Sequence, residues 1–201
     1  GPNTGGMGTV APMEIDSSLF QKIIQDVVEP TQKGIQAEGF DYKGVVFIGI
    51  MVTDSGPQVL EYNVRFGDPE TQVLLPLLAG DWGKVFFDIA QGKKPNLQWK
   101  DCYATCVVLA SEKYPESSVK DVVIEGDFSE KETQYLLHAG TKRSNENQWV
   151  TNGGRVLNAI GLGSNLNESI EKAYEQADKV NWPGRQMRKD IGQKALKNHR
   201  H

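Results

Sequence analysis

The segment from Lys43 to Phe66 places the strongest constraint on the fold of this chain. Two β-rich runs are separated by the tetrapeptide DSGP, and all four of its residues favour turns. The segment therefore predicts a β-hairpin. Its first strand, 45–52, is apolar at nearly every position, so we expect both of its faces to be covered. Its second strand, 58–63, alternates in polarity and brings charged side chains to its carboxyl end.

A helical pattern precedes the hairpin. Ser17 or Ser18 can cap a helix whose apolar residues recur on one face. Pro30 is expected to end or kink this helix, and the pattern can resume before Gly39 stops it. This part of the chain therefore predicts a helix that is interrupted near its middle.

Two shorter helices are expected after the hairpin. Pro69 suits the first turn of a helix over 71–78. A second helix within 80–93 is expected to stop at Gly92. These helices complete the first half of the chain.

The character of the chain changes near Asn96, where we place a domain boundary that gives domains of 1–95 and 96–201. The second half predicts four strands followed by two helices. The strands are expected at 103–110, 119–124, 134–138 and 148–161, and the helices at 167–180 and 187–196.

Composition excludes several classes of protein. A chain of 201 residues with 38% hydrophobic content can bury a core, and its net charge of −4 argues against nucleic-acid binding, which needs a basic surface. Two cysteines, Cys102 and Cys106, do not make a disulfide framework, and we expect buried thiols in a reducing compartment. No apolar run reaches the length of a membrane span, which favours a soluble, cytoplasmic protein.

The end of the predicted hairpin gathers polar side chains suited to phosphate chemistry. Glu61 and Asn63 are two residues apart on a strand, so their side chains leave the same face. A carboxylate oxygen and an amide oxygen suit Mg²⁺, and Arg65 in the same phase can bind a phosphoryl or carboxylate group. The alternative is an ion pair between Glu61 and Arg65 at the strand end. Asp68 could orient Arg65 or cap the following helix, and the cap is the more ordinary role.

Two other segments allow both a functional and a structural interpretation. Four glycines in the first eight residues can let amide groups turn toward an anion, but a flexible terminus would look the same. His138, beside two leucines, is more often a structural residue than a catalytic base. The sequence TNGGR, 151–155, predicts a tight turn before an apolar strand.

Six segments, taken in order along the chain, resemble one enzyme family. They are GPNTGGMG at 1–8, AEGFDYKGVVFIGIMV at 37–52, EYNVRFGDPETQ at 61–72, HAGT at 138–141, VTNGGRVL at 150–157 and RKDIGQKAL at 188–196. Together they resemble the phosphoribosylamine-glycine ligases (glycinamide ribonucleotide synthetases) of the ATP-grasp superfamily. The resemblance implies an α+β fold. It would comprise the carboxy-terminal lobe of an ATP-grasp fold, an antiparallel sheet flanked by helices, and then a small mixed β/α domain with terminal helices.

The resemblance also implies an activity and a set of site residues. Enzymes of this family use ATP to convert glycine to glycyl phosphate, which the amine of 5-phosphoribosylamine attacks in purine biosynthesis. By resemblance, Glu61 and Asn63 are the ligands of Mg²⁺ or Mn²⁺, and Arg65 faces the reacting phosphoryl group. Asp68 has a supporting role in the same turn. The substrate-binding loop would consist of Pro2, Asn3, Thr4, Gly5, Gly6, Met7 and Gly8.

The likeness extends only to the carboxy-terminal half of the family. The lobe that brings the lysines, the lid and most of the adenine pocket is expected to lie upstream, so we interpret this chain as a fragment that needs the amino-terminal half as partner. One loop, EKYPESS at 112–118, departs from the GGYPG of many relatives and leaves its contacts open. Two other functions remain possible at this stage: a non-catalytic binding or assembly module, and an ATP-grasp ligase that joins a different acid and amine.

Overall fold

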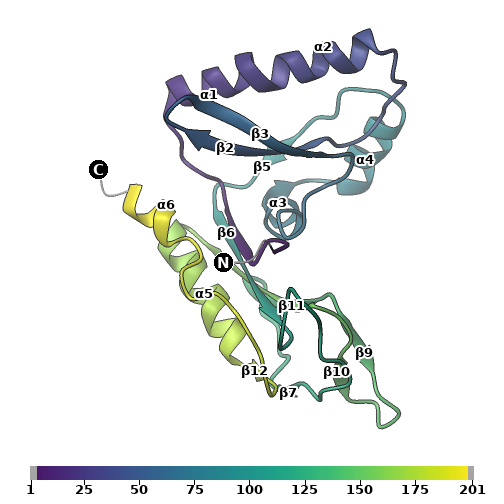
Figure 1. The fold of residues 1–201 in the computed structure, drawn as a ribbon, viewed down its shortest axis with the longest axis vertical. Helices are drawn as coiled ribbons and strands as arrows, with labels where there is room; N and C mark the ends of the chain where they lie inside the picture. Colours follow the sequence, from purple (N-terminus) through teal and green to yellow (C-terminus); the bar gives the residue numbers. More distant parts are fainter. Residues whose placement is uncertain (1–3, 199–201) are drawn as a thin grey trace. The chain divides into compact units, whose positions relative to one another are not determined.

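The computed structural model describes residues 4–198, which divide into two compact units (Figure 1). Unit 1 contains residues 4–13, 68–78 and 99–198, and unit 2 contains residues 14–67 and 79–98. Both units are therefore assembled from separated segments of the chain. The division into domains 1–95 and 96–201 stays a prediction.

Unit 1 is built on a four-stranded antiparallel sheet with the strand order β1-β6-β11-β8. The strands are β1 (Gly8–Ala11), β6 (Tyr103–Ala110), β8 (Gln134–His138) and β11 (Arg155–Gly163). The observed bounds of β6 and β8 equal the predicted ones. Every residue of β6 after Tyr103 is buried, as its continuous apolar sequence predicts for a strand covered on both faces.

Helices from two parts of the chain cover the two faces of this sheet. Helix α5 (Leu166–Asp178) runs along one face, where Ala173 packs with Leu109 and Leu157 (Figure 1). The opposite face holds a second cluster, in which Val73 of helix α3 (Thr71–Leu77) packs with Cys106 and other buried residues of the central strands. The core of unit 1 thus joins residues from both halves of the sequence.

Close packing between α5 and the sheet depends on Gly161. A Cβ atom at this position would lie 2.2 Å from the backbone oxygen of Ser169, so only glycine fits without a shift of the helix. In the same interface the Thr105 and Ser169 hydroxyls form a buried hydrogen bond of 2.8 Å. Asn165 caps α5 by accepting a hydrogen bond of 3.0 Å from the backbone N–H of Glu168.

Short strand pairs complete unit 1, and three elements of this unit differ from their predicted bounds. The pairs are β9 (Thr141–Arg143) with β10 (Trp149–Thr151), and β7 (Glu125–Gly126) with β12 (Val180–Asn181). The strand predicted at 119–124 is replaced by irregular chain with one isolated bridge, and the strand predicted at 148–161 is broken at the Gly153–Gly154 turn. The last helix, α6 (Gln193–Asn198), is shorter than predicted, because residues 187–192 pack as irregular chain.

Unit 2 begins with a helix that is not interrupted at Pro30. Its segments α1 (Ser17–Ile23), η1 (Ile24–Val28) and α2 (Glu29–Ala37) follow one another directly and lie along the hairpin (Figure 1). The middle segment is a π-helix, and Pro30 follows it in the first turn of α2, where a missing N–H is tolerated. Asp16 caps α1 in place of the predicted serines, and Gly39, with φ of +69°, follows the last turn as predicted.

The predicted hairpin is present in unit 2. It pairs β2 (Phe47–Thr53) with β3 (Gly56–Asn63) in antiparallel register. The expectation that both faces of the first strand are covered is wrong for the described residues, because the end of β2 is exposed. The unit also contains α4 (Trp82–Ala90), capped by Asp81 and followed by Gly92 in a left-handed conformation.

A further two-stranded pair joins β4 (Leu78–Ala79) and β5 (Gln98–Trp99). Within residues 4–198, none of the helices is long and apolar enough to cross a membrane.

Candidate functional site

The proposed metal ligands lie at the carboxyl end of β3 in unit 2. Glu61 and Asn63 are two residues apart on this strand, so both side chains leave the same face. Gly49 of β2 lies directly opposite Glu61, and a Cβ atom there would approach the Glu61 Cγ to 3.0 Å. A glycine at position 49 therefore leaves the Glu61 carboxylate its room. The donor set, a carboxylate and an amide oxygen beside open space, fits a hard divalent cation.

Arg65 follows this strand and lies on the surface of unit 2. Its Nη1 donates a hydrogen bond of 2.8 Å to the carbonyl oxygen of Phe66. This contact uses one of the five N–H donors of the guanidinium. Among the described residues there is no group of three or more His, Cys, Asp or Glu side chains that could hold a metal. A cation at Glu61 and Asn63 would therefore need waters or phosphate oxygens to complete its coordination.

The glycine-rich loop is packed against the rest of unit 1 in its described part. A Cβ on Gly6 would lie 2.4 Å from Pro69, and one on Gly8 would lie 2.7 Å from the carbonyl oxygen of Cys106. These glycines therefore permit close approach of the loop to its neighbours. Pro2 and Asn3, also predicted to bind substrate, lie outside the described residues, whereas Thr4 and Met7 are described and lie beside these glycines.

Asp68 is held by two side chains in unit 1. Its Oδ2 accepts a hydrogen bond of 2.7 Å from Arg155 Nη2, and its Oδ1 accepts one of 2.8 Å from Gln72 Nε2. The Oε1 of Gln72 is buried and has no hydrogen-bond partner among the described residues. Neither partner of Asp68 was predicted from the sequence. The expected helix cap is wrong, because no side chain caps α3 among the described residues.

Arg155 is the residue of this site that the sequence reasoning missed. Its guanidinium donates to the carbonyl oxygens of Gly6 (3.2 Å) and Asp68 (2.6 Å) as well as to the Asp68 carboxylate. The available signal was the position of an arginine directly after the Gly153–Gly154 turn, which we interpreted as structural. The glycine-rich loop, the turn at Asp68 and the start of β11 thus meet at one side chain.

The loop at 112–118 also contributes to this meeting point. A Cβ on Gly5 would lie 2.9 Å from the Tyr114 hydroxyl, and one on Gly154 would lie 2.5 Å from the Tyr114 ring. Tyr114 therefore lies between the glycine-rich loop and the Gly153–Gly154 turn, although its flanking residues depart from the usual pattern of the family.

The buried thiol of Cys106 lies under this cluster. Burial raises the pKa of the Cys106 thiol, and the negative charges of Asp68 and Glu70 raise it further. The Sγ atom is 3.8 Å from the Asn158 Oδ1. Such a thiol stays protonated, as expected of a structural cysteine.

A hollow of about 360 Å³ lies beside β1 in unit 1. It is lined by residues 8–10 and by the segment 188–195, which carries the RKDIG sequence. Arg188 forms an ion pair of 2.5 Å with Asp190, and this hydrogen bond lowers the pKa of the Asp190 carboxyl. The segment therefore packs directly against the strand that continues the glycine-rich loop.

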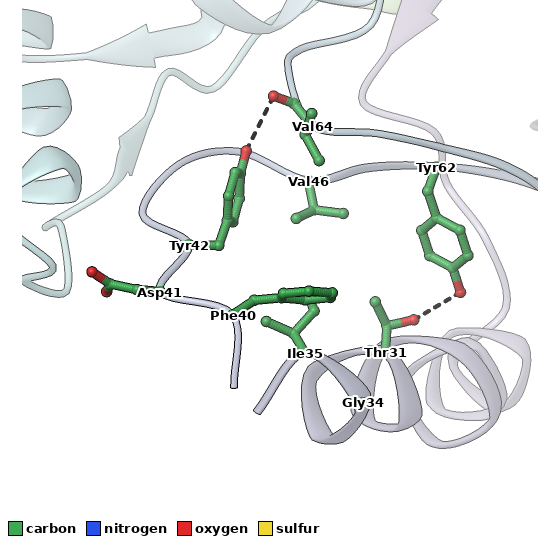
Figure 2. A pocket seen from close by; sticks show the side chains of 9 residues that line it. All are labelled: Thr31, Gly34, Ile35, Phe40, Asp41, Tyr42, Val46, Tyr62 and Val64. Atoms are coloured by element: carbon green, nitrogen blue, oxygen red, sulfur yellow. Dashed lines mark hydrogen bonds between the residues drawn. The ribbon is translucent and has the colours of Figure 1, made fainter. Parts of the chain in front are cut away.

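Unit 2 has a larger, apolar hollow of about 670 Å³ between α2 and the end of the hairpin (Figure 2). The side chains of Ile35, Phe40 and Val46 line it. Two hydrogen bonds border it: Tyr62 pairs with Thr31 at 2.9 Å, and the Tyr42 hydroxyl donates to the Val64 carbonyl at 3.1 Å. Since Tyr62 alternates with Glu61 and Asn63 along β3, this hollow lies on the opposite face of the strand from the candidate metal ligands.

Two family models match the chain. Residues 1–71 match the phosphoribosylglycinamide synthetase ATP-grasp (A) domain, and residues 104–194 match the phosphoribosylglycinamide synthetase C domain. The phosphoribosylamine-glycine ligase of Caldanaerobacter subterraneus subsp. tengcongensis is 42% identical in an alignment 194 positions long, which covers 95% of this chain and 46% of that protein. The trifunctional purine biosynthetic protein adenosine-3 of Drosophila melanogaster is 43% identical in an alignment 204 positions long, which covers 98% of this chain and 15% of that protein.

Two solved structures are also similar to this chain. The crystal structure of phosphoribosylamine-glycine ligase from Thermotoga maritima matches with a TM-score of 0.83 and 38% identity, over 95% of this chain and 47% of that one. The biotin carboxylase domain of 2-oxoglutarate carboxylase from Hydrogenobacter thermophilus matches with a TM-score of 0.64 at 14% identity, over 97% of this chain and 46% of that one, which is a likeness of fold alone.

The fold is therefore that of the carboxy-terminal part of an ATP-grasp protein, and the predicted α+β class is confirmed. Within that class, the chain belongs to the phosphoribosylglycinamide synthetase family. It spans about half the length of the phosphoribosylamine-glycine ligases that it matches. The match to the ATP-grasp domain contains β1 and the turn at Asp68, which pack in unit 1 with residues of the C domain.

Proposed function

We propose that this chain forms part of a phosphoribosylamine-glycine ligase, an ATP-dependent ligase that joins glycine to 5-phosphoribosylamine. The products would be glycinamide ribonucleotide, ADP and phosphate. The observation that carries the proposal is the match to both domain models of one family, in family order, at about 40% identity to relatives of that name. The placement of Glu61 and Asn63 on one face of β3 supports it.

Glu61 and Asn63 would hold Mg²⁺ or Mn²⁺ through their side-chain oxygens. When bound, the ion would neutralise charge on the phosphates of ATP, which takes part as co-substrate. The side chain of Arg65 would bind the reacting phosphoryl group through the guanidinium donors that Phe66 does not use. In this proposal, the role of Arg65 is electrostatic, and it neither gives nor takes a proton.

Residues 2–8 would bind the substrate. The proposal assigns Pro2, Asn3 and the loop from Thr4 to Gly8 to substrate binding, with Asp68 in support of the loop. Close packing of Gly6 against Pro69 favours a defined loop over a loose terminus. A loop held in this way can present its backbone N–H groups to an anionic substrate group.

The remainder of the enzyme would be the partner of this chain. The chain covers 46% to 47% of the ligases that it matches, and unit 2 exposes large apolar side chains such as Leu60 and Val64. Exposed apolar surface of this kind favours contact with another protein segment. A cytoplasmic location and the absence of nucleic-acid or membrane partners remain predictions from composition.

The test uses a polypeptide that joins this chain to the remaining half found in its relatives. We expect ADP formation that requires both glycine and phosphoribosylamine. Glu61→Gln should lower that rate by more than about 100-fold, because a metal ion contributes several kcal/mol of charge stabilisation. Electron paramagnetic resonance of Mn²⁺ should show weaker binding in the same variant. Glu146→Gln, in an exposed loop of unit 1, is the matched control and should change neither result.

Three outcomes would contradict the proposal. Full activity of Glu61→Gln would exclude its role as a metal ligand. ADP formation with another acid and amine, but not with glycine and phosphoribosylamine, would indicate a different ATP-grasp ligase. A folded polypeptide that forms no ADP with any acid and amine would favour a binding or assembly module.

A further inference from the structure

We infer that Arg155 is a positioning residue that holds the glycine-rich loop in the arrangement that binds substrate. The inference rests on the proposed function and names a residue to which neither the sequence motifs nor the comparisons assign a role. Arg155 lies at the start of β11, and all of its partners belong to unit 1. In this inference, the effect of Arg155 on the reaction passes through the loop, because its Nη1 binds the Gly6 carbonyl oxygen.

Arg155 joins two segments that are far apart in the sequence. Nη1 donates to the carbonyl oxygens of Gly6 at 3.2 Å and Asp68 at 2.6 Å, and Nη2 donates to the Asp68 Oδ2 at 2.7 Å. A planar guanidinium can satisfy three acceptors in fixed directions, which a lysine ammonium on a flexible stem cannot reproduce. The Arg155 side chain is only 22% exposed, so these bonds are partly shielded from water.

The surrounding glycines leave this arrangement little freedom. A Cβ on Gly5 would lie 3.2 Å from the Arg155 Cζ and 2.9 Å from the Tyr114 hydroxyl. A Cβ on Gly6 would lie 2.4 Å from Pro69. The loop therefore packs on the guanidinium, on Tyr114 and on the turn at Asp68 with only backbone atoms between them.

The hydrogen bond to Gly6 sets the direction of the next peptide group. A trans peptide is planar, with its C=O and N–H pointing in opposite directions. Because the Gly6 carbonyl points at Arg155, the N–H of Met7 points away from the guanidinium. Loss of Arg155 would free this peptide plane to rotate, since the bond on its amino-terminal side is the ψ bond of a glycine. The expected result is a loop that no longer presents its donors in one direction to an anionic group of the substrate.

Arg155 also orients the carboxylate of Asp68. Its side chain is 52% exposed, and it accepts hydrogen bonds from Arg155 and Gln72 on its two oxygens. Removal of the guanidinium would leave Gln72 as the one side chain, among the described residues, that donates a hydrogen bond to this carboxylate. Both the loop and the turn would therefore lose their shared anchor in a single substitution.

The experiment measures Arg155→Lys and Arg155→Ala in the joined polypeptide described above. We expect the KM for phosphoribosylamine to rise about 10- to 100-fold, the range for loss of hydrogen bonds to a charged group, while the KM for ATP changes less than about twofold. Guanidinium ion added to Arg155→Ala should restore part of the lost affinity. Hydrogen exchange should increase at residues 4–8 in both variants.

Arg185→Lys is the matched control. Its guanidinium also donates to two carbonyl oxygens, those of Ala177 and Val180, and pairs with an aspartate, Asp178, at 3.6 Å. These contacts have the same form but involve α5 and β12 instead of the loop. A purely structural role for Arg155 would make the two arginines equivalent.

The inference is overturned if Arg155→Lys leaves the KM for phosphoribosylamine unchanged, or if Arg185→Lys raises it equally. It is also overturned if the variants lose kcat alone without a change in exchange at residues 4–8. The proposed function fails separately, because that failure would appear as an unsubstituted polypeptide that forms no ADP with glycine and phosphoribosylamine.

Discussion

The two units of this chain bury their apolar residues to very different extents. In unit 1, the central strands β6 and β11 are buried along almost their whole length, since α5 covers one face of the sheet and α3 the other. In unit 2, the hairpin leaves Leu60 63% and Val64 74% exposed. Unit 1 therefore has a hydrophobic core of its own. The hairpin of unit 2 is also rich in apolar side chains, but among the described residues no element buries them to the same extent.

This difference separates two sources of stability. Unit 1 is stabilised by burial of its apolar side chains within the chain itself, by about 25 cal/mol per Å² of apolar surface. Unit 2 is stabilised less in the chain as given and retains apolar surface for contact with other segments. Substitutions that test packing should therefore have large effects in unit 1 and small effects in unit 2.

The largest difference is expected between two leucines. Leu157 is fully buried in the core of unit 1, so Leu157→Ala should lower the free energy of unfolding by about 2–5 kcal/mol. Leu60→Ala, at an exposed position of unit 2, should change it by less than about 0.5 kcal/mol. Urea unfolding of the chain measures both values, and equal losses would mean that the hairpin is as well packed as the sheet.

Alanine substitutions at two glycines should have smaller effects on stability, and the two effects should have opposite signs. Gly161→Ala would place a methyl group 2.2 Å from the Ser169 backbone, so it should destabilise unit 1 by about 1–3 kcal/mol. Gly34→Ala adds a methyl group in open space on helix α2, so it should stabilise unit 2 by up to about 1 kcal/mol.

Hydrogen exchange of the α5 and α2 amides separates these two effects. Faster exchange in α5 of Gly161→Ala and slower exchange in α2 of Gly34→Ala are expected. A destabilised α2 in Gly34→Ala would contradict the open environment that the structure gives this position.

The smallest expected effect is a pH dependence confined to unit 1. Burial lowers the pKa of His138 from its usual 6.5, and the nearby Arg143 lowers it further. The ring packs against Trp149, with centroids 4.0 Å apart, and its Nδ1 is 2.9 Å from the Thr141 Oγ1. Because the unfolded chain binds the proton at a higher pH than the folded chain, stability should fall as the pH drops below about 6.5.

His138→Gln tests this dependence, because glutamine does not titrate. The variant should lose the part of the decrease in stability below pH 6.5 that comes from position 138, as measured by urea unfolding at several pH values. The sequence of unit 2 contains no histidine, so exchange of its amides should show no pH dependence that comes from a histidine. An unchanged pH profile in His138→Gln would show that the ring keeps its ordinary pKa.

Much of the fold could be predicted from local sequence. The hairpin and the strands at 103–110 and 134–138 follow from apolar runs bounded by turn residues. The apolar run at 119–124 did not become a strand, because side-chain and isolated backbone contacts, such as that of Val122 with the Thr151 hydroxyl at 3.1 Å, hold it instead. The sequence left open whether Pro30 ends or kinks the helix, because the π-helix before it has no simple sequence pattern.

The candidate site was only partly accessible to sequence reasoning. The pair Glu61 and Asn63 is local and follows from strand periodicity. Arg155 contacts Gly6 and Asp68, which precede it by 149 and 87 positions. No local sequence pattern predicts contacts over such separations. The same holds for Tyr114 beside Gly5, which only the folded chain brings together.

The long separation between Gly6 and Arg155 also matters during protein synthesis. The strand that continues the glycine-rich loop, β1, pairs with β6, and β6 in turn pairs with β11. The loop and its anchor are 149 residues apart, which the ribosome needs about 7–30 s to add at 5–20 residues per second. Throughout that time Gly6 cannot form its hydrogen bond to Arg155. A ribosome that stops before residue 155 would leave the loop without its anchor.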